Sequence, residues 1–159
     1  MKRADPKKLA GVFSHYEQWL GAPDGFLVAI AVKENSYNPE TGQYTGKTSP
    51  AGARGLMQLM PISLVEIRKS AGLRVNPDDP VQAICGAAVM LAVRQRQLRA
   101  IVGRQPTWAE LIAGYNGGNR GGRIFMSTGR PASRETAGYL SHMRAAIGQS
   151  LDHTAAIKV

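Results

Sequence analysis

Carboxylic side chains are scarce in this sequence, so each can be assigned a role from its position. The chain has 11 Asp and Glu residues among its 159 residues. Four are expected to cap helices or to lie in first helical turns, namely Asp5, Asp24, Asp79 and Glu110. Five more are expected on solvated surface, namely Glu17, Glu40, Glu66, Asp78 and Asp152. Glu34 and Glu135 remain as candidates for chemistry.

Glu34 lies where a general acid could be generated. It follows the apolar stretch Phe26 to Val32, close to the expected end of a helix. The negative end of the helix dipole and partial burial both disfavour a charged carboxylate, so both raise its pKa. A carboxylic acid that stays protonated near neutral pH can donate a proton to a leaving group. By position alone, a surface glutamate at the start of a loop is the commoner arrangement.

Helices are expected to position this residue. Capping side chains, two of them followed by proline, precede segments with apolar residues at helical spacing. The expected N-caps are Asp5, Asp24, Asp79, Thr107 and Ser133. The first helix should end at Gly21 and the second before Pro39. The helix from Pro80 is expected to be the central buried one, with an apolar stripe opposite the arginines Arg94, Arg96 and Arg99.

Other segments predict loops and shorter pieces. Asn38 to Gly52 is polar and reads as a long surface loop, in which a short strand at Tyr44 is the only β candidate. Ala53 to Met60 and Ile62 to Ala71 are predicted to be two short helical pieces. A helix that starts after Thr107 is predicted to end at Asn116-Gly117-Gly118, before a Gly- and Arg-rich loop from Gly121 to Pro131.

Four segments occur in an order that points to a known family. They are Glu34-Asn35-Ser36-Tyr37-Asn38-Pro39, the run from Ser49 to Pro61, Gly114-Tyr115-Asn116-Gly117-Gly118, and Glu135-Thr136-Ala137-Gly138-Tyr139-Leu140. In this order they resemble the motif set of soluble-type lytic transglycosylases, and Gly55 to Pro61 is the most specific block. The resemblance covers about residues 26–147.

This resemblance implies a mainly helical, lysozyme-like single domain over residues 1–159, with a long loop or small β-hairpin after Glu34. It implies cleavage of the β-1,4 bond between N-acetylmuramic acid and N-acetylglucosamine in peptidoglycan. Glu34 would protonate the glycosidic oxygen and later accept the proton of the muramoyl C6 hydroxyl, which closes a 1,6-anhydro ring. Such a reaction needs one protein carboxylate rather than two, and no metal or cofactor is expected.

The resemblance also implies the residues that bind substrate. Ser49 would hold the N-acetyl group, and the Tyr115 hydroxyl would lie near Glu34 and orient it. The remaining residues assigned to the cleft are Met57, Gln58, Met60, Asn116, Glu135 and Tyr139. From the residues alone plainer roles fit as well: Ser-Pro forms turns, methionine and tyrosine pack in cores, and Glu135 suits the first turn of its own helix.

The chain departs from the family pattern in three places. Asn35 stands where serine is usual, Gly114 stands where alanine is frequent, and the link from Glu40 to Thr48 is longer than the common one. If the longer link placed Glu40 near the cleft, a two-carboxylate muramidase would be the alternative. A non-catalytic wall-binding or virion structural protein is a further alternative.

Composition bears on partners and location. The net charge is +9, so an anionic partner such as the cell wall is expected, whereas nucleic acid is not, because no recognised binding motif occurs. Cys85 is the only cysteine, and no apolar run reaches the length of a membrane-spanning helix. The N-terminus does not read as a signal peptide. We therefore expect a monomeric bacteriophage lysis enzyme or virion component, made in the cytoplasm, delivered by holin-type lysis or within a virion, and acting on the periplasmic wall beside other lysis or virion proteins.

Overall fold

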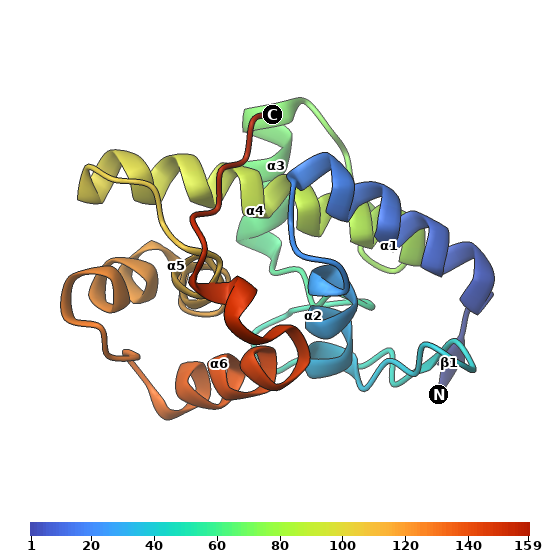
Figure 1. The fold of residues 1–159 in the computed structure, drawn as a ribbon. Coiled ribbons are helices and arrows are strands. Elements are labelled where there is room, and N and C mark those ends of the chain that lie inside the picture. The colour runs from blue at the N-terminus through green and yellow to red at the C-terminus, as the bar shows by residue number, and fades with distance from the viewer.

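Helices make up most of the molecule. The computed structural model describes all residues, 1–159, and 62% of them are helical. The helices are α1 (Pro6–Leu20), α2 (Phe26–Asn35), α3 (Pro61–Ala71), α4 (Pro80–Val102), α5 (Trp108–Thr128) and α6 (Arg134–Ile147), followed by the 3-10 helix η1 (Gly148–Asp152). The long helix α4 lies against α1, α2, α3 and α5, while α6 packs on α2 and α5 (Figure 1). The central position expected for α4 is confirmed.

A small sheet joins the N-terminus to the loop that follows α2. Strand β1 (Lys2–Arg3) pairs antiparallel with β2 (Gln43–Tyr44), so that Lys2 faces Tyr44. The expected short strand at Tyr44 is confirmed, as is the long loop around it. Its partner comes from the start of the chain rather than from a local hairpin.

Local capping signals account for most helix starts. The side chains of Asp5, Asp79, Thr107 and Ser133 all accept hydrogen bonds from first-turn amides, as expected. Asp24 does not cap α2; Gly25 holds the N-cap position without a side-chain bond. Glu17 of α1 caps α2 in place of Asp24, because the amides of Gly25 and Leu27 donate to the two Glu17 carboxylate oxygens at 3.1 and 2.8 Å. Glu17 is therefore buried, which corrects its expected solvated position.

One hydrophobic core holds most of the helices together. It contains 30 buried residues, including Leu9 of α1, Phe26 of α2, Leu91 of α4, Leu111 of α5 and Met143 of α6. A smaller cluster joins α3 to α4 and consists of Ile67, Val89, Met90 and Val93. Because α2, α5 and α6 share the larger core, the segments that carry Glu34, Tyr115 and Glu135 are fixed relative to one another.

Three expectations about the elements are wrong. Residues 53–60 form turns and one Arg54–Leu59 bridge rather than a helix, because Gly55 and Gln58 adopt positive φ angles of 75° and 51°. Helix α5 changes direction at Gly118 (φ 70°) and then continues to Thr128, where a loop was expected. Arg94 is buried in α4 instead of lying on its solvated face.

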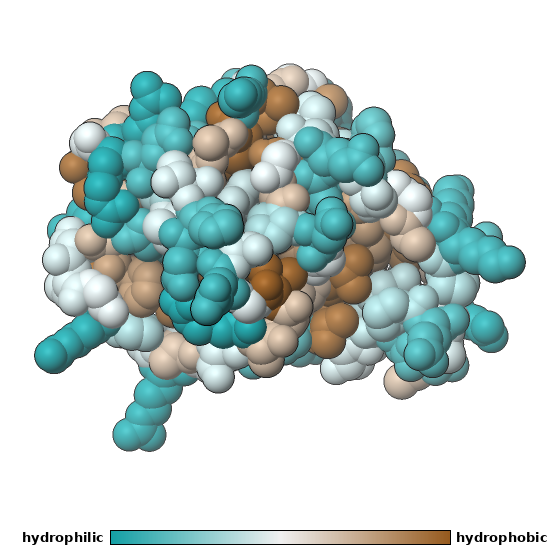
Figure 2. Space-filling view, in the orientation of Figure 1, coloured by the Kyte–Doolittle hydropathy of each residue, from teal (hydrophilic) through white to brown (hydrophobic).

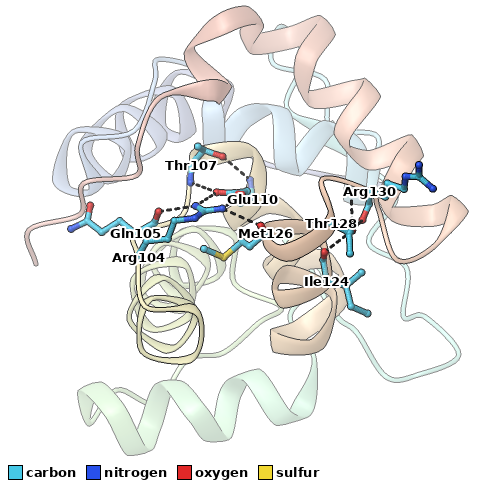
Figure 3. A network of polar contacts seen from close by, with 8 residues as sticks. All are labelled: Arg104, Gln105, Thr107, Glu110, Ile124, Met126, Thr128 and Arg130. Carbon is cyan, nitrogen blue, oxygen red and sulfur yellow. Dashed lines mark hydrogen bonds and ion pairs between the residues drawn. The ribbon is translucent and has the colours of Figure 1, made fainter.

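Arg104 ties the beginning of α5 to its end (Figure 3). Its guanidinium donates to both oxygens of Glu110 at 2.8 and 2.7 Å and to the carbonyl of Met126 at 3.1 Å. Glu110 also accepts from the amide of Thr107 and completes a capping box. The change of direction at Gly118 brings the last turn of α5 within reach of this cluster, and Arg104 stabilises that arrangement.

The surface is largely hydrophilic. Figure 2 shows charged and polar side chains projecting from the face seen in Figure 1, with apolar areas scattered between them. The exposed large apolar side chains include Ile62, Leu73 and Ile101. No helix has the length and hydropathy needed to cross a membrane.

Candidate active site

The motif segments meet at one groove of about 530 Å³. Glu34 enters it from the last turn of α2, and the loop from Lys47 to Met60 forms one side. Ser63 of α3 and Met90 and Arg94 of α4 form another side. The remaining wall consists of Tyr115, Asn116, Glu135 and Tyr139 from α5 and α6.

Glu34 has the protonation behaviour expected of a general acid. The pKa of its carboxyl is raised to about 7, chiefly by burial and in smaller part by the negative charge of Glu135, while Lys47 and Lys33 oppose the shift. No hydrogen bond to the carboxylate stabilises its charged form. Near neutral pH a large part of the Glu34 population is thus protonated and can donate a proton.

Two tyrosines line the groove together with Glu34. The Tyr115 hydroxyl donates to the carbonyl of Met57 at 3.2 Å, and burial together with the charge of Glu34 raises its pKa. The Tyr139 hydroxyl is buried without a hydrogen-bond partner, and burial, then Glu34 and Tyr115, raise its pKa. Both phenols therefore stay neutral in the groove, and the Tyr139 hydroxyl has no acceptor in the protein. The expected direct contact of Tyr115 with Glu34 stays a prediction, because its hydroxyl is bonded to the loop.

The loop that borders the groove is held by its own polar residues. The Ser49 hydroxyl accepts from the amide of Ala53 at 2.9 Å, which is the turn role that its sequence alone suggested. The Gln58 amide group donates to the carbonyls of Lys47 and Gly55 at 2.8 and 3.0 Å. Gly55 is required sterically, since a Cβ there would lie 1.6 Å from the carbonyl oxygen of Pro77. Ser49 and Gln58 both line the groove.

Asn35, the residue after Glu34, is the buried anchor of this loop. Its amide nitrogen donates to the carbonyl of Gly55, and its Oδ1 accepts from the hydroxyl of Thr45 and from the amide of Gly46 at 2.9 Å. Its backbone carbonyl accepts from the amide of Thr45. The departure from serine at this position thus ties the last turn of α2 to both parts of the long loop.

Asn116 and Glu135 connect α5 to α6 at the groove. The Asn116 amide donates to Glu135 at 3.2 Å, and its oxygen accepts from the hydroxyl of Thr136 at 2.6 Å. Two turns further along α6, His142 Nε2 lies 2.8 Å from the carbonyl of Ala29 in α2. These contacts fix Glu135 close enough to Glu34 for its charge to influence the Glu34 pKa.

The structure brings together most of the residues expected at the site but not all. Met60 lines the groove, whereas the Met57 side chain is fully buried in the core, so its expected place in the cleft is wrong. Glu40 lies in a separate shallow depression with Tyr37 and Pro39 rather than in the groove. The longer link therefore does not bring a second carboxylate to Glu34.

Sequence reasoning missed several groove residues. Lys33 and Lys47 lie beside the motifs, and their charges act on Glu34. Ser63, Met90 and Arg94 belong to helices outside the motifs, so no local pattern identified them. No group of three or more His, Cys, Asp or Glu residues is arranged to hold a metal ion.

Comparison with known families agrees with this geometry. The family model described as transglycosylase SLT domain matches residues 12–133, which is more than half of the chain. The chain belongs to the transglycosylase SLT domain family. A comparison with curated proteins found no match.

The SLT domain has a mainly helical, lysozyme-like fold and is a transglycosylase that cleaves glycosidic bonds, with peptidoglycan as its substrate. The matched range includes Glu34, the loop to Pro61 and Tyr115. Glu135 and Tyr139 lie just beyond it, in α6, and complete the groove of this SLT domain.

Proposed function

We propose that this SLT domain is a lytic transglycosylase that cleaves the β-1,4 bond between N-acetylmuramic acid and N-acetylglucosamine and forms 1,6-anhydromuramoyl ends. One observation carries the proposal: Glu34, with its pKa raised to about 7, enters a groove bordered by all four motif segments. A catalytic acid needs a pKa near the working pH. Peptidoglycan is the substrate of the family.

Glu34 serves in turn as acid and base. The protonated carboxyl donates its proton to the glycosidic oxygen while the bond from muramoyl C1 to that oxygen breaks. The carbonyl oxygen of the substrate's N-acetyl group stabilises the positive charge at C1. The Glu34 carboxylate then takes the proton of the C6 hydroxyl as its oxygen bonds to C1, so the carboxyl is restored and no water is consumed. Ser49, at the groove, is the residue we assign to the N-acetyl group.

The position of Glu40 disfavours the hydrolytic alternative expected from the long link, since a muramidase of the two-carboxylate type needs its second acid in the groove. Glu135 is the other acid that lines the groove, but it is bonded to Asn116. The bacteriophage origin and the delivery route stay predictions.

The test is mass spectrometry of the fragments released from purified sacculi. The wild type should release 1,6-anhydromuramoyl ends, and Glu34→Gln should release none. Glu40→Gln is the matched control, because it removes a nearby carboxylate that lies outside the groove, and it should act like the wild type. Reducing ends would mean hydrolysis, and an active Glu34→Gln protein would refute the assigned acid. No fragments from any variant would favour a non-catalytic wall-binding or structural protein.

A further inference from the structure

Arg94 is a buried cation in the wall of the groove. It lies on α4, its side chain retains 9% of its accessible surface, and it lines the same groove as Glu34. Arg96 and Arg99 of the same helix are exposed. A buried charge is unfavourable unless hydrogen bonds and counter-charges compensate it. The hydrogen bonds and counter-charges of Arg94 therefore determine how well the groove wall compensates its charge.

The protein makes few hydrogen bonds to this guanidinium. Arg94 Nη1 donates to Gln97 Oε1 at 2.9 Å, and that is its one hydrogen bond to a protein acceptor. Glu66 of α3 is the nearest counter-charge, at 3.8 Å from Nη2, which is beyond hydrogen-bond distance. Arg94 Nε is buried without any partner. Nε and Nη2 form one edge of the guanidinium, so a whole edge lacks hydrogen bonds.

The residues around Arg94 hold its side chain in place but leave most of its N–H groups without an acceptor. Gln97 donates to Glu66 at 3.2 Å and accepts from Asn119 of α5 at 3.2 Å. Glu66 is thus hydrogen-bonded to Gln97, and its contact with Arg94 is a longer ion pair. The Asn119 side-chain oxygen is buried and also has no partner. Residues of three helices therefore fix the Arg94 guanidinium in the groove wall, with Nε and Nη2 making no hydrogen bond to the protein.

Gly114 provides the space that Arg94 occupies. A Cβ at this position would lie 3.1 Å from Arg94 Cγ and 2.8 Å from Leu98 Cδ1, both too close for ordinary contact. The glycine at the start of the Gly-Tyr-Asn motif, where the family often has alanine, therefore accommodates the Arg94 stem. This departure from the family pattern and the buried arginine belong to one arrangement.

From these contacts we propose that Arg94 forms a subsite in the groove for a carboxylate of the peptide attached to the muramic acid residue. The glycan strand itself offers neutral hydroxyl and acetamido groups. The attached peptides carry carboxylates, and a carboxylate in the groove can accept a charge-assisted hydrogen bond from Arg94 Nη2, which makes no hydrogen bond to the protein. The inference rests on the proposed function for its substrate, and it adds recognition of the peptide to recognition of the glycan.

Binding in the inactive Glu34→Gln background tests the subsite without depending on turnover. Three ligands are titrated by calorimetry: a GlcNAc–MurNAc tetrapeptide, the same compound with its carboxylates converted to amides, and chitotetraose, which has the β-1,4 glycan linkage and no carboxylate. Replacing Arg94 with Met should weaken the tetrapeptide compound about tenfold, equivalent to about 1.4 kcal/mol. Affinity for the amidated compound and for chitotetraose should not change.

Arg96→Met is the matched control, since it removes an exposed arginine from the same helix. It should leave all three affinities unchanged. Arg94→Lys should recover only part of the affinity, because one ammonium group must serve both Gln97 and the ligand, whereas Nη1 and Nη2 of the guanidinium donate separately. If Arg94→Met unfolds because Glu66 loses its counter-charge, the double change Arg94→Met with Glu66→Gln replaces it.

Each result of these titrations either supports or overturns the Arg94 subsite. Equal loss for the tetrapeptide compound and chitotetraose would assign Arg94 to the sugar or to structure and would overturn the subsite. The subsite would also be overturned if Arg94→Met left the affinity for the tetrapeptide compound unchanged. The same holds if the amidated compound bound as tightly as the tetrapeptide compound, or if the tetrapeptide compound did not bind at all. The failure of the proposed function is a different result, namely sacculi that release no 1,6-anhydro ends while these affinities still depend on Arg94.

Discussion

Asn35 Oδ1 accepts a hydrogen bond from the amide of Gly46 at 2.9 Å, so the residue after Glu34 holds the middle of the long loop. The side-chain nitrogen of Asn35, Nδ2, donates to the carbonyl of Gly55, in the part of the loop that borders the groove. Because Asn35 follows Glu34 directly in the chain, the carboxyl and the loop that borders it are positioned by one side chain.

Removal of the Asn35 side chain should therefore destabilise the protein and impair catalysis together. Asn35→Ala leaves buried partners without hydrogen bonds, and we expect a loss of about 2 to 3 kcal/mol in the free energy of unfolding, measured by urea denaturation. Asn38→Ala is the control, because Asn38 makes its turn hydrogen bonds in an exposed position, and it should lose less than about 1 kcal/mol. Equal losses from the two variants would contradict the anchoring role.

The activity should fall as the pH rises through about 7, because Glu34 must be protonated to donate its proton. Lys47 lowers the Glu34 pKa, so Lys47→Met should move this alkaline limb to higher pH. Glu135 raises it, so Glu135→Gln should move the limb to lower pH. The measurement is kcat/KM against pH on soluble glycan strands. Lys7→Met is the control. If the alkaline limb kept its position in both Lys47→Met and Glu135→Gln, the assignment of this limb to Glu34 would be refuted.

Glu34 should also make the wild type less stable at alkaline pH. Its pKa is about 7 in the folded protein against 4.5 for the ordinary group, so the folded state binds more protons between these values. The free energy of unfolding then falls as the pH rises through this window. Glu34→Gln should be more stable than the wild type by about 2 to 3 kcal/mol at pH 8 and no more stable at pH 4, as thermal unfolding would measure. A stability difference independent of pH would exclude a raised Glu34 pKa.

Glu17, which caps α2, should contribute more to the free energy of unfolding than Asp24, the acid just before that helix. Glu17→Ala leaves the amides of Gly25 and Leu27 without their acceptor, and a loss of about 2 to 3 kcal/mol is expected in chemical denaturation. Asp24→Ala removes an exposed side chain that makes no cap, so its effect should be within about 0.5 kcal/mol. The reverse ranking would mean that the sequence-based assignment of the cap was right after all.

Arg104 should contribute stability that disappears in acid. Burial alone would raise the pKa of Glu110, but the hydrogen bonds from Arg104 and Thr107 lower it below its ordinary value. A lowered carboxylate pKa gives stability that is present above the ordinary pKa of about 4.5 and is lost as the pH falls below it. Arg104→Met should thus cost about 1 kcal/mol at pH 7, since Arg104 is half exposed, and less at pH 3. Unfolding curves at both pH values would reveal a constant difference if the ion pair were unimportant.

Sequence by itself determined the features that depend on neighbouring residues. Asp5 with Pro6, Asp79 with Pro80, and Thr107 with Glu110 each place a capping oxygen within three residues of the amides that it binds, so local chemistry starts those helices. Glu34 lies at the end of a single apolar segment, and the order of the four motifs can be read directly along the chain. The helical fold class and the transglycosylase family were therefore predictable.

Only the tertiary structure decided which distant groups meet. Glu17 reaches α2 from another helix, Arg94 is buried because Gly114 leaves it room, and α5 continues past Gly118 as Arg104 holds its two ends together. The packing of the folded chain likewise places Met57 in the core and Glu40 outside the groove. Burial and pairing of these side chains depend on segments far apart in the chain, so no local pattern in the sequence encodes them.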